Sequence, residues 1–191
     1  MLFELRSYDL RPGRALPYVE VFRSLGLGLI TRHLPLGGYW MAETGRLNRL
    51  EHLWIYESLE ERAACRSGLA EDKDWNEAFL PRAFPDLLRQ ENRFMVLERS
   101  SPLFDAVVAS RRTRHANQGP EVPVFEDRFQ ALVHSEGEIA GEVQAAFRVT
   151  SGARPGTVVT LFAGDAGARM APGGNVLLHQ ILRPLSFSPL R

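Results

Sequence analysis

The segment RLEHLWIYE, residues 49–57, decides the fold of this chain. Leu53 and Ile55 alternate in it with aromatic and polar residues, and this period of two predicts a β-strand with one aliphatic face. The opposite face carries His52, Trp54 and Tyr56. The segment 2–10 shows the same alternation, with Phe3 and Leu5 on one face and Glu4, Arg6 and Tyr8 on the other. Two such strands predict a sheet with one aliphatic face and one aromatic and polar face.

Working outward from these strands, the first hundred residues predict the order β-α-β-β-α-β. The predicted strands are residues 2–10, 36–44, 49–57 and 92–99. The first helix is indicated by Leu16, Val19, Phe22 and Leu25, which recur at helical spacing. The second begins with the capping box Ser58-Leu59-Glu60-Glu61 and runs to about Leu88, with breaks near Asp72 and Pro81.

The second half is interpreted as a degenerate, shorter repeat of the first. Val124-Phe125-Glu126-Asp127-Arg128 parallels Leu2-Phe3-Glu4-Leu5-Arg6. A helix is expected over 138–148 and strands over 157–163 and 176–183, while Gly164–Gly174 is too rich in glycine and alanine for a long second helix. The predicted organisation is a ferredoxin-like unit at 1–103, a solvated linker at 104–123 and a truncated second unit at 124–191.

Composition excludes several classes of protein. The 191 residues carry 23 basic and 23 acidic side chains, and each half is close to neutral, so the basic field that nucleic-acid binding requires is missing. No segment has the apolar length of a membrane span, and Glu4 and Arg6 interrupt any leader sequence, which predicts a cytoplasmic protein without a membrane partner. Cys65 is the only cysteine, so no intrachain disulfide or cysteine zinc site is expected.

The two strand faces lead to a hypothesis about a site. A four-stranded sheet with both helices on one side must bury its other side, usually against a second sheet. The simplest assignment places Phe3, Leu5, Leu53 and Ile55 under the helices. The other face would then line a cavity between two sheets, which is a common setting for a small-molecule pocket. The residues assigned to this cavity are Glu4, Arg6, Tyr8, His52, Trp54 and Tyr56. The competing interpretation is an Arg6–Glu4 pair with aromatic packing at an oligomer interface.

Other candidates are less distinctive. Arg32 and His33 lie at the end of the first helix, where cations favour the helix dipole, and they are also candidates for the pocket, as is Tyr39. The arginines of Arg111-Arg112-Thr113-Arg114 are read as part of a solvated linker, with a phosphate-binding patch as the alternative. No spacing of histidines demands a metal, and no motif for a cofactor, a phosphate loop or a nucleophile elbow is present, so no metal and no cofactor are expected.

The residues of the predicted strand faces and their neighbours resemble the NIPSNAP family. The resemblance covers residues 1–104 and rests on segments in the family's order: Glu4-Leu5-Arg6-Ser7-Tyr8, Leu10-Arg11-Pro12-Gly13-Arg14, Thr31-Arg32-His33-Leu34, Leu36-Gly37-Gly38-Tyr39, Glu43, Gly45, Leu47-Asn48, His52-Leu53-Trp54-Ile55-Tyr56-Glu57-Ser58-Leu59, Arg62 and Gln90-Glu91-Asn92-Arg93. It implies a dimeric α+β barrel in which ferredoxin-like sheets pack face to face. The family has no assigned reaction, so the resemblance does not supply one.

Two functions remain open. In the first, a homodimer binds a small organic molecule between its sheets and acts, in one version, as a cofactor-independent enzyme. The candidate catalytic residues are then His52 as acid or base, Arg6 as the anchor of an oxygen, and Tyr8 as a hydrogen-bond donor. In the second, the chain is a non-enzymatic module for protein interaction, whose interior is filled by side chains.

Overall fold

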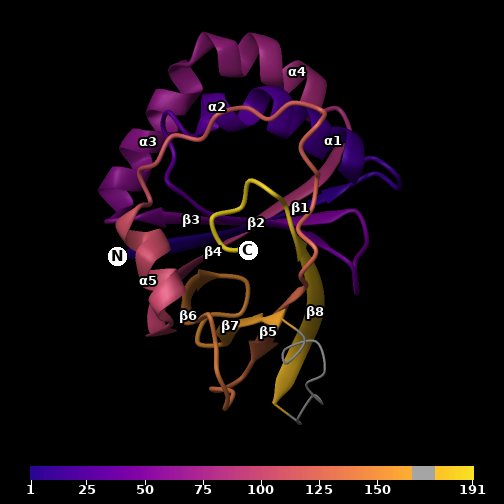
Figure 1. The fold of residues 1–191 in the computed structure, drawn as a ribbon. Coiled ribbons are helices and arrows are strands. Elements are labelled where there is room, and N and C mark those ends of the chain that lie inside the picture. Colours follow the sequence, from indigo (N-terminus) through magenta and orange to yellow (C-terminus); the bar gives the residue numbers. More distant parts are fainter. Residues whose placement is uncertain (165–174) are drawn as a thin grey trace.

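The fold of residues 1–164 and 175–191, which the computed structural model describes, is a closed β-barrel, and the helices of the first hundred residues cover one side of it (Figure 1). The order of strands around the barrel is β4-β1-β3-β2-β8-β5-β7-β6, and all neighbours are antiparallel. The strands are β1 (Leu2–Leu10), β2 (Leu36–Ala42), β3 (Arg49–Tyr56), β4 (Leu87–Ser100), β5 (Gln130–Ser135), β6 (Ala145–Gly152), β7 (Val158–Ala163) and β8 (Val176–Pro184).

The β-α-β-β-α-β order predicted for the first half is confirmed. The first helical segment consists of α1 (Ala15–Val21), a π-helical turn at Phe22–Gly26 and α2 (Leu27–Ile30). The second consists of α3 (Leu59–Glu71), a π-helical turn at Trp75–Phe79 and α4 (Leu80–Ala83). Both cover the outer face of the sheet formed by β1–β4 (Figure 1).

Two local features of these helices follow from the sequence. The hydroxyl of Ser58 accepts a hydrogen bond from the backbone N–H of Glu61 at 3.2 Å, as the capping box predicts, while the Glu61 carboxylate reaches the N–H of Glu57. A Cβ on Gly26 would lie 2.4 Å from the ring of Phe79, so glycine allows the two helical segments to pack closely.

The repeat is present in the topology. The first four strands have the spatial order β4-β1-β3-β2, and the last four have the equivalent order β8-β5-β7-β6. The counterpart of β1 is therefore β5 (Gln130–Ser135). Residues 124–128, which resemble β1 in sequence, contribute only the isolated bridge Phe125–Leu185. The two halves therefore share one strand order, and in the second half the sheet begins at β5 and not at residues 124–128.

The helix expected over 138–148 is absent. Residues 136–144 contain no helix, and Gly141 has a φ of +122°, a conformation that interrupts helix geometry. β6 begins at Ala145, and Ala145, Phe147 and Val149 alternate into the barrel core. The glycine- and alanine-rich stretch of the sequence lies largely outside the described residues.

The segment expected to be a solvated linker is partly structural. Helix α5 (Pro102–Ala109) contributes Phe104 and Val107 to the barrel core. The chain then crosses the outside of the first helical segment as an extended strap, residues 111–123 (Figure 1). The buried Arg23 side chain donates hydrogen bonds to the carbonyls of Gly119 and Val122 at 3.0 and 2.8 Å, which ties the strap to the helix.

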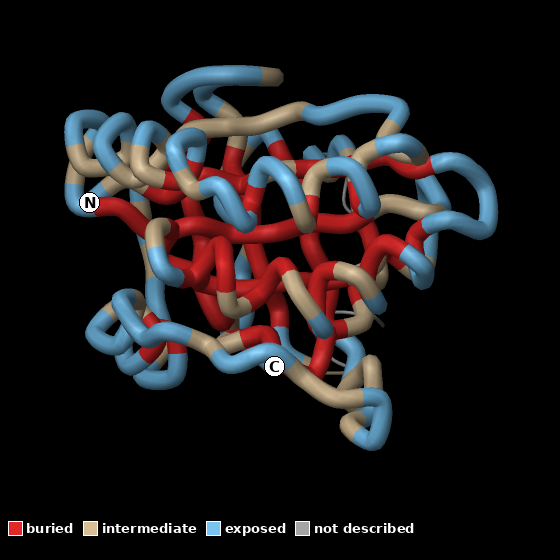
Figure 2. Tube along the Cα trace, turned by 90° about the horizontal axis from the view of Figure 1, so that it is seen from above, coloured by how far each residue is buried: buried red, intermediate tan, exposed pale blue. Residues whose placement is uncertain are grey.

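The assignment of the strand faces is reversed relative to the sequence-based expectation. Phe3, Leu5, Leu53 and Ile55 point into the barrel, where they join a continuous apolar cluster with residues from both units. The aromatic and polar face lies under the helices instead. Strands β1, β2, β3 and β5 are largely buried, whereas much of β4 and the end of β6 are exposed together with the outer surfaces of the helices and loops (Figure 2).

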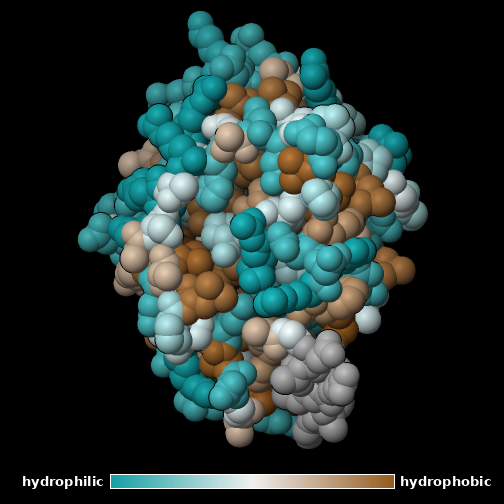
Figure 3. All heavy atoms as spheres, in the orientation of Figure 1, coloured by the Kyte–Doolittle hydropathy of each residue, from teal (hydrophilic) through white to brown (hydrophobic). Residues whose placement is uncertain are grey.

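This reversal bears on two expectations from the sequence. Arg6 and His52 do not line a cavity between sheets, because their face of the sheet lies under the helices. The opposite face, in the barrel interior, is filled by buried side chains that are mostly apolar, with Ser7 and Glu51 among them. The expectation of a homodimer started from an uncovered sheet face; the second unit covers that face within the same chain, and the homodimer stays a prediction. In the described part of the chain, no helix has the length and apolar character to cross a membrane. On the face shown in Figure 3, hydrophobic residues lie in separate groups among hydrophilic ones.

Candidate functional site

A row of side chains crosses the outer face of the first sheet, beneath the helices. The strand register places Asn92, Arg6, His52 and Tyr39 side by side on β4, β1, β3 and β2. Directly opposite residues in antiparallel strands have Cβ atoms about 4.5–5.5 Å apart, so these side chains are neighbours. We call them the polar row. It contains Arg6, His52 and Tyr39, three of the residues singled out in the sequence. They lie in the layer between the sheet and the helices, and not between two sheets.

Glu4 is the acidic partner of the polar row. Its carboxylate is fully buried and accepts hydrogen bonds from Arg6 at 3.0 Å, Arg62 at 2.9 Å, Arg66 at 3.2 Å and Asn92 at 2.8 Å. Burial alone would raise the pKa of Glu4, but the hydrogen bonds and charges of these partners lower it to about 2. Three guanidinium groups therefore surround one carboxylate, and the group of four carries two positive charges in excess.

The Arg6–Glu4 pair that the sequence offered as a structural alternative exists, but Glu4 does not satisfy its partners completely. Buried polar atoms without a hydrogen-bond partner collect around the polar row: Arg6 Nε, Arg66 Nε, His52 Nε2, Tyr39 Oη and Tyr56 Oη. An unpaired buried polar atom costs about 1–3 kcal/mol. Such a concentration in one layer marks a place where a ligand could supply the missing partners.

His52 is held in a defined protonation state. Trp54 Nε1, which can only donate, lies 2.6 Å from His52 Nδ1. Nδ1 must therefore accept, and the single proton of the neutral ring is on Nε2. Burial, together with the charges of Arg6 and Arg66, lowers the pKa of His52 well below its usual value. The ring also stacks on Tyr39, with 4.8 Å between ring centres, and meets the edge of Tyr8 at 4.6 Å.

The tyrosines of this layer are neutral donors. Burial raises the pKa of Tyr39, Tyr56 and Tyr18 above the ordinary value. Tyr18, on α1, was not identified from the sequence, since its position in a helix resembles an ordinary core residue. Tyr8 lies beside Arg6, whose guanidinium carbon is 5.6 Å from the centre of the Tyr8 ring. The rings of Tyr8 and Tyr18 meet edge to face, with 6.3 Å between their centres.

Arg32 and His33 lie apart from the polar row. They line a separate hollow of about 210 Å³ together with Arg112 and Arg114 of the strap. Carboxylates neutralise much of the charge of this hollow: Asp72 lies 2.8 Å from His33 Nε2 and 3.5 Å from Arg32, and Arg112 contacts Glu61. The phosphate-binding alternative for the arginines of the strap is not favoured by this balance of charge.

Another hollow, of about 360 Å³, lies where α4 leads into β4, and is lined by Phe84, Leu87, Leu88, Arg89 and Gln90. The Gln90 side chain accepts a hydrogen bond from Arg6 Nη2 at 2.8 Å. The ring of Phe84 meets the edge of Tyr8, with 6.3 Å between ring centres. The sequence analysis missed Gln90 as a site residue, because it expected β4 to begin at Asn92 and not at Leu87.

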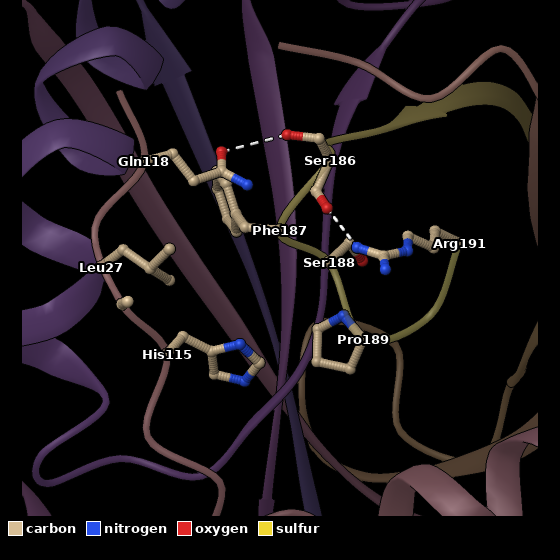
Figure 4. Close-up of a pocket in the computed structure, with 9 residues that line it drawn as sticks. Leu27, His115, Gln118, Ser186, Phe187, Ser188, Pro189 and Arg191 are labelled. Atoms are coloured by element: carbon tan, nitrogen blue, oxygen red, sulfur yellow. Dashed lines mark hydrogen bonds between the residues drawn. The ribbon is translucent and has the colours of Figure 1, made fainter. Parts of the chain in front are cut away.

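A hollow of about 270 Å³ lies between α2, the strap and the C-terminal segment (Figure 4). Leu27 and His115 form one side and the segment Ser186–Arg191 forms the other, while Ser186 donates a hydrogen bond to Gln118 at 3.0 Å. Phe187 separates this hollow from the polar row, since its ring packs against Tyr39 at 5.4 Å. Across the described residues, no three His, Cys, Asp or Glu side chains come together as a metal site.

Comparison with known proteins places this geometry in a family. The NIPSNAP family model matches residues 3–102, which include all of the first unit from β1 to β4. The chain belongs to the NIPSNAP family. The polar row and Glu4 all lie within the matched residues, whereas β5–β8 lie outside them.

Curated relatives share this unit. Protein NipSnap homolog 3B of Mus musculus is 40% identical over 79 residues, which are 41% of this chain and 32% of the relative. Protein NipSnap homolog 3A of Homo sapiens is 36% identical over 98 residues, which are 51% of this chain and 39% of the relative. The matched stretch thus spans well under half the length of these relatives.

Solved structures also match either the first unit or nearly the whole chain. An uncharacterised NIPSNAP domain protein from Burkholderia xenovorans is 37% identical, with a TM-score of 0.51, and 99% of it matches 53% of this chain. A Lactobacillus acidophilus protein described as a candidate monooxygenase matches 96% of this chain at 7% identity, with a TM-score of 0.50. The first likeness covers one unit, and the second shows a similar fold for nearly the whole chain.

Proposed function

We propose that this NIPSNAP protein binds a small organic anion in the layer between the first sheet and the helices. The observation that carries the proposal is the polar row: Arg6, His52 and Tyr39 are neighbours, and each has a buried polar atom without a partner. The two excess positive charges around Glu4 favour a negatively charged ligand.

Each residue has a role in this proposal that follows from its surroundings. Arg6 binds the anionic oxygens. His52 donates from Nε2–H as a neutral group, because Trp54 occupies Nδ1 and the pKa of the ring is low. This differs from the acid or base role expected from the sequence. Tyr56 and Tyr39 donate from hydroxyl groups that otherwise lack partners. If a reaction occurs, such donors would stabilise a developing oxyanion on the ligand.

The architecture supports a further part of the proposal. We take the chain to be a fused form of the dimeric α+β barrel, in which the second unit occupies the position of a partner subunit. The equivalent strand orders of the two units support this reading. The non-enzymatic alternative, a protein-interaction module with a filled interior, has the packed barrel core in its favour. It gives no reason for the unpartnered polar atoms beneath the helices.

Titration calorimetry of the full chain with benzoate tests the proposal. We expect saturable binding that weakens at least tenfold in Arg6→Gln and severalfold in Tyr56→Phe. The Tyr56 hydroxyl has no partner within the protein, so its removal should leave the melting temperature unchanged or higher. Arg148→Gln is the matched control, because Arg148 pairs with Glu98 on the outside of β6 and β4. Absence of binding, or equal weakening in Arg6→Gln and Arg148→Gln, would contradict the proposal.

A further inference from the structure

The hollow at the start of β4 combines an apolar wall with a connection to Arg6. Phe84, Leu87 and Leu88 supply the wall, and Leu88 is 61% exposed. Its volume of about 360 Å³ falls within the range of small-molecule sites, roughly 300–1,000 Å³. An exposed leucine in such a hollow has apolar surface available for a ligand.

Gln90 links this hollow to the polar row. Its side chain lines the hollow, and its Oε1 accepts from Arg6 Nη2 at 2.8 Å. The Arg6 side chain is 14% exposed and Glu4 is fully buried, so Arg6 is the member of the pair that solvent reaches. Gln90 itself is exposed. A ligand that enters the hollow therefore meets the Arg6 guanidinium at the position that Gln90 Oε1 holds.

The chemistry of this position selects a carboxylate. A neutral amide oxygen on a guanidinium is a weaker partner than a carboxylate oxygen, because charge-assisted hydrogen bonds are roughly twice as strong. The surrounding charge also favours the exchange, since Arg6, Arg62 and Arg66 share only Glu4. The apolar wall next to this position would bury a hydrocarbon chain.

We propose that the ligand is an amphiphilic carboxylic acid whose carboxylate displaces Gln90 from Arg6 and whose apolar chain lies along Phe84, Leu87 and Leu88. This inference rests on the proposed function and adds to it the class of ligand and the route of entry. It makes Gln90 a specificity-determining residue and the α4–β4 connection the mouth of the site.

The first experiment measures the affinity of the full chain for butyrate, hexanoate and octanoate by titration calorimetry. If the apolar chain lies in the hollow, the affinity rises about fourfold for each added methylene. Leu88→Glu should weaken octanoate binding at least tenfold and change butyrate binding much less. Leu103→Glu is the matched control, because Leu103 is an exposed leucine of α5 beside a different hollow.

The second experiment uses Gln90→Glu, which places a carboxylate of the protein itself next to Arg6. It should weaken all three acids at least tenfold, whereas Gln90→Ala should leave binding intact or strengthen it. Carboxylates that bind with an affinity independent of chain length, or a Leu88→Glu variant that behaves like Leu103→Glu, would overturn this inference and leave the proposed function standing. If no carboxylate binds the unmodified chain, both fail together.

Discussion

The outer faces of the two units differ, although the units share one strand order. In the first unit, Arg6 of β1 lies opposite His52 of β3. At the equivalent place in the second unit, Val133 of β5 lies opposite Thr160 of β7. Ala131, Val133 and Phe162 form a small apolar cluster there, and on the other side of β5 Val133 lies opposite His179 of β8. The second unit thus closes its part of the barrel with Val133 where the first unit has Arg6, and the direct pairing of an arginine with a histidine is what suggests a ligand in the first unit.

The largest expected effect comes from removing the second unit. Residues 1–101 alone would expose Phe3, Leu5, Leu53 and Ile55 to water. A sheet face of this kind needs a cover, and a second copy of the unit can provide one. We expect this fragment to sediment as a dimer in analytical ultracentrifugation. A stable, soluble monomer would show that the interior face does not need the second unit.

A smaller effect separates the two partners in the buried ion pair. Glu4→Gln leaves three guanidinium groups without a carboxylate, and we expect a loss of about 3 kcal/mol in the free energy of unfolding. In Arg6→Gln, Glu4 retains Arg62, Arg66 and Asn92, so the loss should be about 1 kcal/mol.

Urea denaturation of both variants measures this difference directly. Equal losses would mean that Arg6 is as necessary to the fold as Glu4 is. The Arg6 side chain would then be structural and not reserved for a ligand.

The smallest effect concerns the barrel interior and appears only as a dependence on pH. Glu51 lies on the same face of β3 as Leu53 and Ile55, and burial raises its pKa from 4.5 to about 7, opposed by a hydrogen bond from Ser7. The folded state therefore keeps this proton at pH values where the unfolded state has lost it. The contribution of Glu51 to stability falls as pH rises from about 4.5 to about 7.

Glu51→Gln removes this dependence. Its stability relative to the unmodified chain should increase by about 2 kcal/mol between pH 5 and pH 8. The low pKa values of His52 and His134 act in the opposite direction over part of this range, but they do so in both proteins and cancel in the difference. A difference that stays constant with pH would indicate that Glu51 titrates normally.

The order of elements in the first unit could be predicted because alternation and capping are local. The capping box at Ser58 and the helix break at Asp72 both appear in the structure. The orientation of the faces could not be predicted in the same way. Trp54, Ile55 and Tyr56 are all fully buried, so both faces of β3 are covered. Alternation alone does not show which of the two faces the helices cover.

Gln90 and β5 escaped prediction for other reasons. Gln90 lies in the polar run Arg89-Gln90-Glu91-Asn92, which has no apolar alternation, yet these residues pair with β1 as part of a strand. β5 was not predicted because residues 124–128 resemble β1 in sequence and thus predict the first strand of the second unit at that place. In the structure these residues form only an isolated bridge. The grouping of Glu4, Arg6, His52 and Tyr39 was thus easier to predict than the place where they meet, since that layer is defined only by the packing.

The most direct test of the central claim is NMR of the full chain, with ¹⁵N-labelled histidine and ¹³C-labelled leucine and isoleucine methyl groups, during titration with octanoate. If the ligand binds beneath the helices, the Nε2–H signal of His52 should shift, while the methyl signals of Leu53 and Ile55 in the barrel interior should remain nearly unchanged. The opposite pattern, in which the interior methyl groups shift and His52 does not, would contradict the account.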